Sequence, residues 1–286
     1  MTTVNDSKFK NYLEAISEKY KCWWNLYTLT DAEGKKNLEQ KSSSLSSPFD
    51  FGLMVETLQP KQEQGNQEEE NQEKEKIERL PVLEGIRKYA NNHVLLVGKP
   101  GSGKSTALVR LLFEEAQAHL EINFQAHSQS RLKTTDLSDS LGSSVNNTTI
   151  PVLVELRYWQ SSIFERIQAF LQQHDANLNL DETTLKNQLR QGKFLLLIDG
   201  VNELPSEDAR RQVAIFRKDY PQTPMIFTTR DLGVGGDLGI EKKLEMQPLN
   251  DLQMREFVMA YLPQQGEELL QRLKDRLREF GKTPLL

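Results

Sequence analysis

Cysteine is nearly absent from this sequence of 286 residues, in which Cys22 is the single thiol. One cysteine cannot form a disulfide within the chain, and it cannot supply the paired thiolates of a CxxC zinc site. The four histidines, His93, His119, His127 and His174, show no spacing typical of metal ligands. The sequence therefore predicts a fold without internal disulfides, and no metal beyond one that a nucleotide brings.

Long hydrophobic runs are also missing. The longest, residues 94–97 and 194–198, fall far short of the roughly 20 residues that a membrane helix needs. The polar start MTTVNDSKFK lacks the profile of a signal peptide, and a net charge of −5 gives the chain no general attraction to phosphate backbones. We expect a cytoplasmic protein without membrane contact, and nothing indicates nucleic-acid binding.

What the chain does contain is an alternation of apolar strands and amphipathic helices, with 37% hydrophobic residues to furnish a core. Near-continuous apolar strands separated by helices are typical of a parallel sheet covered on both faces. We predict an α/β fold with such a sheet, a helical N-terminal extension and a short helical cap after the sheet. The predicted strands are residues 93–98, 150–156, 194–199, 224–229 and 243–249, and the predicted helices between them are residues 104–118, 161–174, 181–191 and 206–217.

Composition divides the chain into four parts. Residues 1–60 are predicted to form the helical extension, and residues 61–79 a polar, glutamate-rich linker that cannot bury enough apolar surface to fold by itself. Residues 80–249 form the α/β domain, with a polar insertion at about 119–149. Residues 250–286 begin a helical domain in which Asn250 is a plausible N-cap.

The N-terminal extension contains an apolar stripe at helical spacing between residues 8 and 27. A helix with such a stripe either packs on the core of its own chain or binds a protein partner. The adjacent aromatic residues Trp23 and Trp24 keep the partner interpretation open, because tryptophan is enriched at interfaces. The stripe consists of Phe9, Tyr12, Leu13, Ile16, Tyr20, Trp23 and Tyr27.

The segment GKPGSGKST, residues 98–106, matches the phosphate-binding pattern GxxxxGK[ST]. It follows an apolar strand and opens a helix, which is the context that this pattern requires. In such a loop the backbone N–H groups point inward, Lys104 reaches the β- and γ-phosphates, and the Ser105 hydroxyl is offered to Mg²⁺. The alternative is an ordinary glycine-rich turn. The residues predicted to contact a nucleotide here are Gly98, Pro100, Gly101, Ser102, Gly103, Lys104, Ser105 and Thr106.

Two further strands end in residues suited to this chemistry. Asp199 ends FLLLID and is predicted to hold the magnesium ion, with Glu203 as the base that activates water. Arg230 follows the strand PMIFTT, where it can face the γ-phosphate. The simpler alternatives are a turn aspartate, a solvated glutamate and a surface salt bridge.

With these three pieces in view, the sequence resembles the NACHT family of signal-transduction ATPases, a branch of the STAND class within the AAA+-related P-loop NTPases. HVLLVGKPGSGKSTAL is similar to the Walker A region of that family, LLLIDGVNELP to its Walker B, and IFTTR to its sensor 1 segment. The resemblance covers residues 80–286. These motifs are most similar to those of bacterial members of the family, cyanobacterial ones included.

The resemblance implies several properties. It implies that ATP or ADP binds with Mg²⁺, that the segment LPVLEGIRKYA lies near the adenine, and that Pro284 of TPLL contacts the base. It implies ATP-driven self-association in bacterial defence or stress signalling. Two departures accompany it: Asn202 stands where the family commonly has an acid, and the family's winged-helix domain and sensing repeats would lie beyond Leu286.

Three functions follow as expectations. The first is a molecular switch that binds ATP and hydrolyses it slowly, with Lys104, Glu203 and Arg230 as the catalytic residues. The second is a scaffold that holds nucleotide with little turnover, which Asn202 favours. The third is another P-loop enzyme; a Ras-like GTPase would carry an NKxD motif, which is not found, and neither the acceptor pocket nor the arginine-rich lid of a nucleotide kinase is evident.

Overall fold

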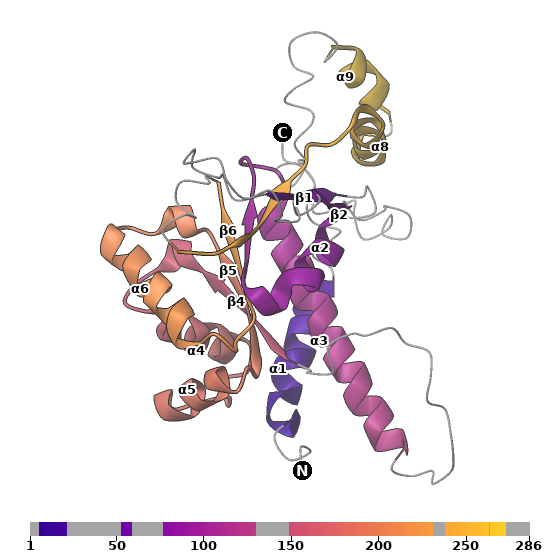
Figure 1. Ribbon diagram of the computed structural model, residues 1–286. Helices are drawn as coiled ribbons and strands as arrows, with labels where there is room; N and C mark the ends of the chain where they lie inside the picture. The colour runs from indigo at the N-terminus through magenta and orange to yellow at the C-terminus, as the bar shows by residue number, and fades with distance from the viewer. Residues whose placement is uncertain are drawn as a thin grey trace, which may run out of the picture.

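A seven-stranded sheet forms the centre of the computed structural model, which describes residues 6–21, 53–58, 77–129, 149–230, 238–262 and 264–272 (Figure 1). In sheet order the strands are β2 (Arg79–Pro81), β1 (Met54–Leu58), β7 (Lys242–Met246), β3 (Val94–Val97), β6 (Met225–Thr229), β5 (Phe194–Asp199) and β4 (Ile150–Glu155). The strands from β7 to β4 are parallel to one another, whereas β1 is antiparallel to both of its neighbours. The predicted α/β fold with a largely parallel sheet is confirmed.

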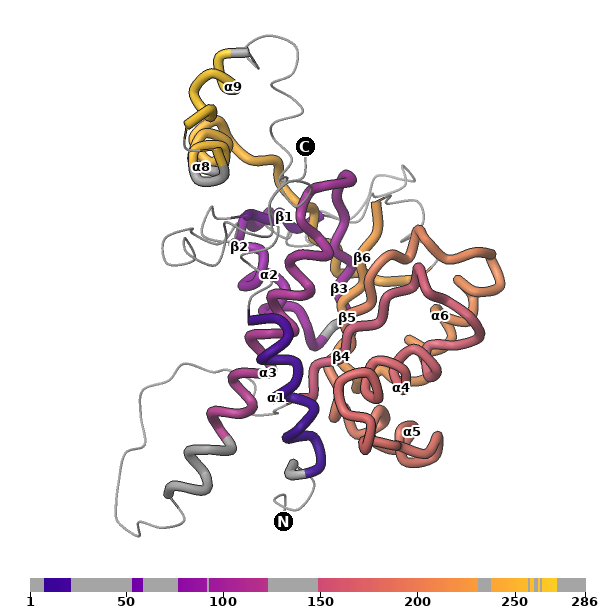
Figure 2. Tube along the Cα trace, turned by 180° about the vertical axis from the view of Figure 1, so that it is seen from behind, coloured from indigo at the N-terminus to yellow at the C-terminus, as the bar shows by residue number. Residues whose placement is uncertain are grey.

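Helices cover both faces of this sheet, as the views in Figures 1 and 2 show. One face carries α2 (Val82–Tyr89) and α3 (Lys104–Gln129), and the other carries α4 (Ile163–His174), α5 (Glu182–Arg190) and α6 (Glu207–Asp219). The last three begin at residues that cap them: the side chains of Ser162, Asp181 and Ser206 each accept a backbone N–H three residues further on. The sequence thus specifies where these helices start.

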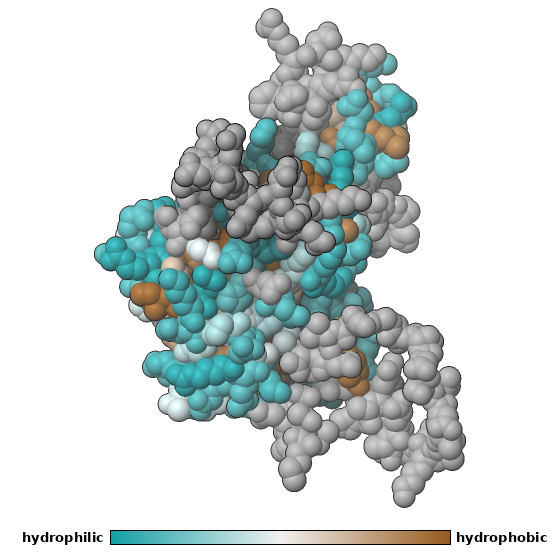
Figure 3. All heavy atoms as spheres, in the orientation of Figure 1, coloured by the Kyte–Doolittle hydropathy of each residue, from teal (hydrophilic) through white to brown (hydrophobic). Residues whose placement is uncertain are grey.

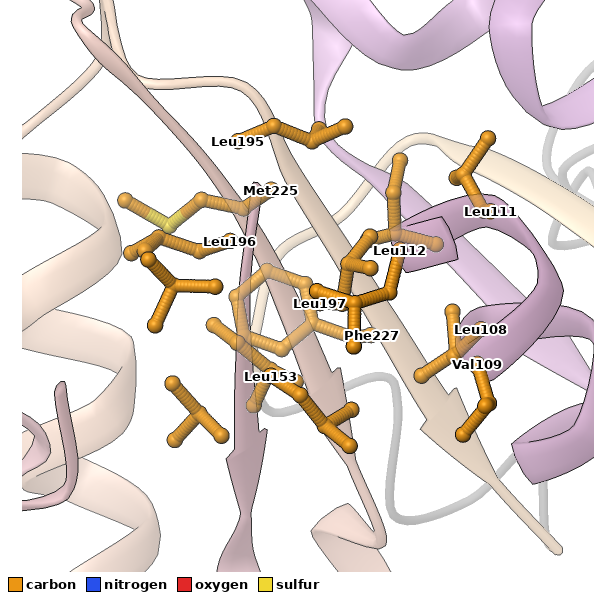
Figure 4. Close-up of a cluster of buried hydrophobic side chains, with 14 of the residues drawn as sticks. Leu108, Val109, Leu111, Leu112, Leu153, Leu195, Leu196, Leu197, Met225 and Phe227 are labelled. Atoms are coloured by element: carbon orange, nitrogen blue, oxygen red, sulfur yellow. The ribbon is translucent and has the colours of Figure 1, made fainter. Parts of the chain in front are cut away.

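Polar side chains dominate the outside, and apolar ones fill the space between the layers. On the face drawn in Figure 3 the described residues are mostly hydrophilic, with small, separate hydrophobic spots. Inside, the strands β3 and β6 are buried along their whole length, because helices cover both sides of the sheet. Figure 4 shows side chains of α3, including Leu108 and Leu112, gathered with those of β5 and β6, including Leu197 and Phe227. This packing fixes α3 on the sheet.

The N-terminal helix α1 (Lys10–Lys21), preceded by the 3-10 turn η1 (Asp6–Phe9), packs beside the edge strand β4. The buried Tyr12 hydroxyl donates a hydrogen bond to the Pro151 carbonyl oxygen at 2.7 Å. Proline has no N–H to pair, which suits an edge strand, and the tyrosine satisfies its outward carbonyl. The Phe9 and Phe194 rings lie 5.8 Å apart. Within the described residues the stripe therefore packs on its own chain; Trp23, Trp24 and Tyr27 lie outside them.

Three elements differ from the sequence-based expectation. The strands β1 and β2 are not anticipated, because β1 is a run of only five residues inside a segment expected to be helical. Helix α3 continues to Gln129 instead of ending near Ala118, since residues 119–126 contain no glycine or proline and His119 is buried. The first part of the polar insertion is therefore a continuation of this helix.

The cap after the sheet contains α8 (Asp251–Tyr261) and α9 (Gly266–Arg272). Asn250 is the N-cap of α8, as predicted, and it forms a reciprocal pair of hydrogen bonds with Gln253. Pro284, the linker residues 61–76 and the end of the predicted second cap helix lie outside the described residues. Among the helices that the structure describes, none is both long and apolar enough to cross a membrane.

Candidate nucleotide-binding site

The sequence-predicted residues meet at one edge of the sheet. Strands β3, β6 and β5 are parallel neighbours, so their carboxyl ends lie side by side. Gly98 follows β3, Arg230 follows β6 and Asp199 ends β5. In open α/β sheets this edge is where ligands bind. The fold therefore brings together three segments that are far apart in the sequence.

The loop between β3 and α3 requires glycine at two positions, at one because of the backbone conformation and at the other because of the space available. Gly103 has a φ of 92°, in the left-handed region that other residues avoid. At Gly98 the constraint is space: a Cβ atom would lie 2.7 Å from Ser102 Oγ and 2.9 Å from Met246 Cβ. Both glycines are needed for the compact turn that the phosphate-binding pattern predicts.

Lys104 is folded back onto this loop. Its ammonium group donates hydrogen bonds to the carbonyl oxygens of Gly98 at 2.6 Å and Lys99 at 2.9 Å. Burial lowers the pKa of this ammonium group to about 8, although the carboxylates of Asp199 and Glu203 act in the opposite direction. The cation is therefore held next to the acids of the site, but its charge is poorly solvated.

The start of α3 provides the other parts of a phosphate site. Lys104 is the first residue of a helix of 26 residues, and the first turn contains no acidic side chain that would repel an anion. Ser105 is exposed, whereas Thr106 is buried. The hydroxyl predicted to hold the metal is thus accessible, and Thr106 lies in the interior of the turn.

Asp199 is fixed by its neighbour on β6. The Thr228 hydroxyl donates a hydrogen bond to Asp199 Oδ1 at 2.5 Å, and the same hydroxyl oxygen accepts the backbone N–H of Gly200 at 2.9 Å. One carboxylate oxygen is therefore oriented by a buried threonine. From the sequence Thr228 is predicted only as part of a strand, although a hydroxyl at the end of one strand is a recognisable partner for an acid at the end of the next.

Arg230 and Glu203 form an ion pair, with 2.9 Å between Arg230 Nη2 and Glu203 Oε1. Glu203 ends the 3-10 turn η6 (Val201–Glu203), which follows β5 after Gly200. The same turn holds the backbone of Arg230, because Asn202 Oδ1 accepts its N–H at 3.1 Å. The arginine side chain is 54% exposed, so it can exchange its partner.

A further pair at this edge is missed by the sequence analysis. Glu155, at the end of β4, lies opposite Asp199 in the strand register, and its carboxylate accepts a hydrogen bond from Arg157. Burial acts to lower the pKa of the Arg157 guanidinium, but Glu155, Tyr158 and Asp199 outweigh it and raise that pKa. An acid near the end of a predicted strand, with an arginine two residues later, is the signal that could have identified them.

The donor set fits a nucleotide with its magnesium ion. No group of three or more histidine, cysteine, aspartate or glutamate side chains that could hold a metal occurs in the part of the chain that the structure describes. The oxygen donors here are the exposed Ser105 hydroxyl and the Asp199 carboxylate, and such hard donors suit Mg²⁺ that keeps several waters and arrives with phosphates. A nucleotide-borne ion therefore matches these residues better than a resident metal.

A comparison with known families identifies the family of the chain. The sequence model of the NACHT domain matches residues 92–265, a segment that contains the loop, Asp199, Glu203 and Arg230. The chain belongs to the NACHT family. It therefore contains a nucleotide-binding NTPase module of the P-loop class, as NACHT domains bind nucleotide, typically with Mg²⁺.

Other comparisons add little to the NACHT assignment. No curated protein matches the chain. Among solved structures the chain is similar to C. elegans PCH-2, with 12% sequence identity and a TM-score of 0.30; the match covers 65% of this chain and 46% of the PCH-2 chain. This chain thus spans less than half of the PCH-2 structure that it matches. The roles of individual residues of the NACHT domain remain predictions from their chemistry.

Proposed function

We propose that this NACHT domain is an ATP-dependent molecular switch that hydrolyses ATP slowly. The observation that supports the proposal is the ion pair between Arg230 and Glu203, at the same edge of the sheet as Lys104 and Asp199. The pair joins a cation suited to a γ-phosphate with an acid suited to activating water. A ligand that bears a γ-phosphate competes for the cation, and a ligand without one does not.

Binding begins, in this proposal, with an exchange of partners at Lys104. The ammonium group leaves the carbonyl oxygens of Gly98 and Lys99 for the β- and γ-phosphate oxygens, which are stronger acceptors because they are charged. The loop N–H groups and the start of α3 contact the same phosphates. Ser105 and Asp199 hold the magnesium ion that accompanies ATP.

The switch then follows from a difference between ATP and ADP. With ATP bound, the γ-phosphate draws Arg230 away from Glu203, and the released carboxylate can accept the proton of the attacking water. With ADP bound, Arg230 returns to Glu203. A nucleotide shifts a conformational equilibrium only if its affinity differs between the two states, and this change of partner is a source of such a difference.

The wider role is inferred from the family resemblance. We propose that the chain acts in bacterial signalling or antiviral defence, that it self-associates when ATP is bound, and that its N-terminal segment contacts a protein partner. Pro284, which lies outside the described residues, is proposed to contact the adenine. Competition between ATP and GTP for the site tests the base preference.

Steady-state ATP turnover with Mg²⁺ tests the proposal. We expect turnover in the unchanged chain and none in Lys104→Ala, which loses the phosphate contact and also reports contaminating ATPase. Glu203→Gln should bind ATP but reduce turnover by about 100-fold, the lower end of what a general base contributes. Lys99→Ala, which changes a neighbouring exposed lysine, is the matched control.

A nucleotide-binding scaffold with little turnover is the second candidate. It is favoured by Asn202, which removes one acid from the site, and by the ion pair that occupies Glu203. Turnover no higher in the unchanged chain than in Lys104→Ala, together with measurable ATP binding, would select the scaffold and reject the switch as proposed.

A further inference from the structure

The end of β5 and the turn η6 that follows it contact the end of β6 at several residues. Thr228 bridges the Asp199 carboxylate and the Gly200 N–H, and Arg230 is contacted by the next two polar residues of the turn, Asn202 and Glu203. One arginine is therefore held at two points: its backbone N–H by Asn202 and its guanidinium group by Glu203.

The direction of the hydrogen bond between Asn202 and Arg230 is defined. The donor is a backbone N–H, so the side-chain atom that faces it must be the amide oxygen. Arg230 follows the last residue of β6, where the strand ladder no longer supplies an acceptor. The side chain of Asn202 thus replaces a strand partner for this amide.

The opposite side of η6 is anchored, which makes the turn a rigid support. Val201 is fully buried, Gly200 adopts a left-handed φ of 85°, and the Glu203 N–H donates to the Gly200 carbonyl oxygen at 2.8 Å. Because the inner side of the turn is fixed, its outer residues have fixed positions, and so do the groups that they hydrogen-bond. Here that is the backbone of Arg230.

From this geometry we infer that Asn202 is a positioning residue of the nucleotide site. It places the Arg230 backbone so that the guanidinium group reaches Glu203 and the γ-phosphate in turn, and its function is that of a hydrogen-bond acceptor, not of a metal ligand. An aspartate at this position could accept the same N–H, because a carboxylate oxygen is also an acceptor. The catalytic part of this inference rests on the proposed function.

Two variants separate the acceptor role from other effects. Asn202→Asp keeps an oxygen acceptor of the same size, and Asn202→Ala removes it. Asn187→Ala, which removes an exposed asparagine on α5, is the matched control.

The first measurement needs no nucleotide. We would follow hydrogen exchange of the Arg230 amide and the guanidinium Nε–H signal by NMR in arginine-labelled, full-length chain, with Arg230→Lys to assign the signals. In Asn202→Ala the amide should exchange about tenfold faster, as expected for loss of one protecting hydrogen bond, and the guanidinium signal should shift. In Asn202→Asp and in Asn187→Ala, the exchange rate of the Arg230 amide and the guanidinium signal should both stay close to their values in the unchanged chain.

The second measurement is ATP turnover in the same variants, with ATP affinity measured separately. Asn202→Ala should lower turnover about tenfold, since small displacements of a positioned group are costly, and Asn202→Asp should restore it. Unchanged Arg230 signals in Asn202→Ala, or an Asn202→Asp variant that behaves like Asn202→Ala, overturn the inference. If the Arg230 signals respond as expected but the unchanged chain shows no turnover, the positioning contact stands and the proposed hydrolysis is what fails.

Discussion

At the scale of single residues, two opposing effects act on the charge of Lys104. Phosphate binding needs a charged ammonium group, whereas its position under the loop is poorly solvated and lowers its pKa to about 8. The two backbone carbonyl contacts keep the cation in place. The consequence is that a group which is ordinarily charged throughout the physiological range titrates close to neutral pH here.

The affinity for Mg·ATP should therefore fall as the pH rises above about 8. Below that pH the free chain already carries the charged Lys104; above it, binding must first add a proton, so the affinity loses up to about tenfold per pH unit. Titration calorimetry from pH 7 to 9.5 measures this slope. Lys99→Ala should show the same profile, and an affinity independent of pH would contradict the assignment.

At the scale of elements, α1 and β4 are matched in length. From Tyr12 to Tyr20 the helix rises about 12 Å, and from Pro151 to Glu155 the strand rises about 13 Å. Tyr12 lies at Pro151, and burial together with the Glu155 carboxylate raises the pKa of Tyr20 to about 12. The helix therefore covers the edge strand at Pro151, and it packs mainly on α3 and α4. Covered edges do not pair with other chains.

Removal of a single hydroxyl tests this contact. Tyr12→Phe leaves the Pro151 carbonyl without the hydrogen bond that Tyr12 donates to it, and the free energy of unfolding should fall by about 1 kcal/mol. Urea denaturation followed by circular dichroism measures the change. Tyr158→Phe, which removes an exposed hydroxyl, should change the stability by less than about 0.5 kcal/mol; equal effects of the two substitutions would show that the bond contributes nothing.

Sequence patterns predicted the five parallel strands because burial on both faces leaves continuous apolar runs such as FLLLID. They did not predict β1, whose pairing with β7 depends on a strand almost two hundred residues away. The site residues at the ends of the strands were predicted from the chemistry of their side chains and from the order of the motifs along the sequence. The partners of those residues were not: the Asn202 contact with Arg230 and the Glu155 contact with Arg157 depend on how two turns face each other.

At the scale of the whole molecule, the NACHT segment does not include all of the sheet. The family match begins at residue 92, whereas β1, β2 and α2 precede it and contribute Val55, Val82 and Ile86 to the core. Without them β7 becomes an unpaired edge beside the strand that carries the phosphate loop. The elements before residue 92 are thus part of one cooperative structure with the matched segment.

A fragment of residues 92–265 should therefore aggregate, while a fragment of residues 6–272 should remain monodisperse. The shorter fragment exposes the apolar surface that α1, α2 and β1 cover and leaves both β7 and β4 without their covering elements. Size-exclusion chromatography with light scattering distinguishes the two. A monomeric 92–265 fragment with a cooperative thermal transition would contradict the claim.

The pairing of β1 with β7 also determines the order in which the molecule can be completed. Thr57 lies opposite Leu244, and β1 also pairs with the short strand β2. During synthesis β1 therefore meets β2 early, but it can pair with β7 only after all the residues between them have been made. Contacts between residues so distant in sequence close large loops and slow folding. The phosphate-loop strand β3, which needs β7 on one side, has to wait for the same event. The nucleotide site therefore cannot assume its final form before β7 has been synthesised and paired.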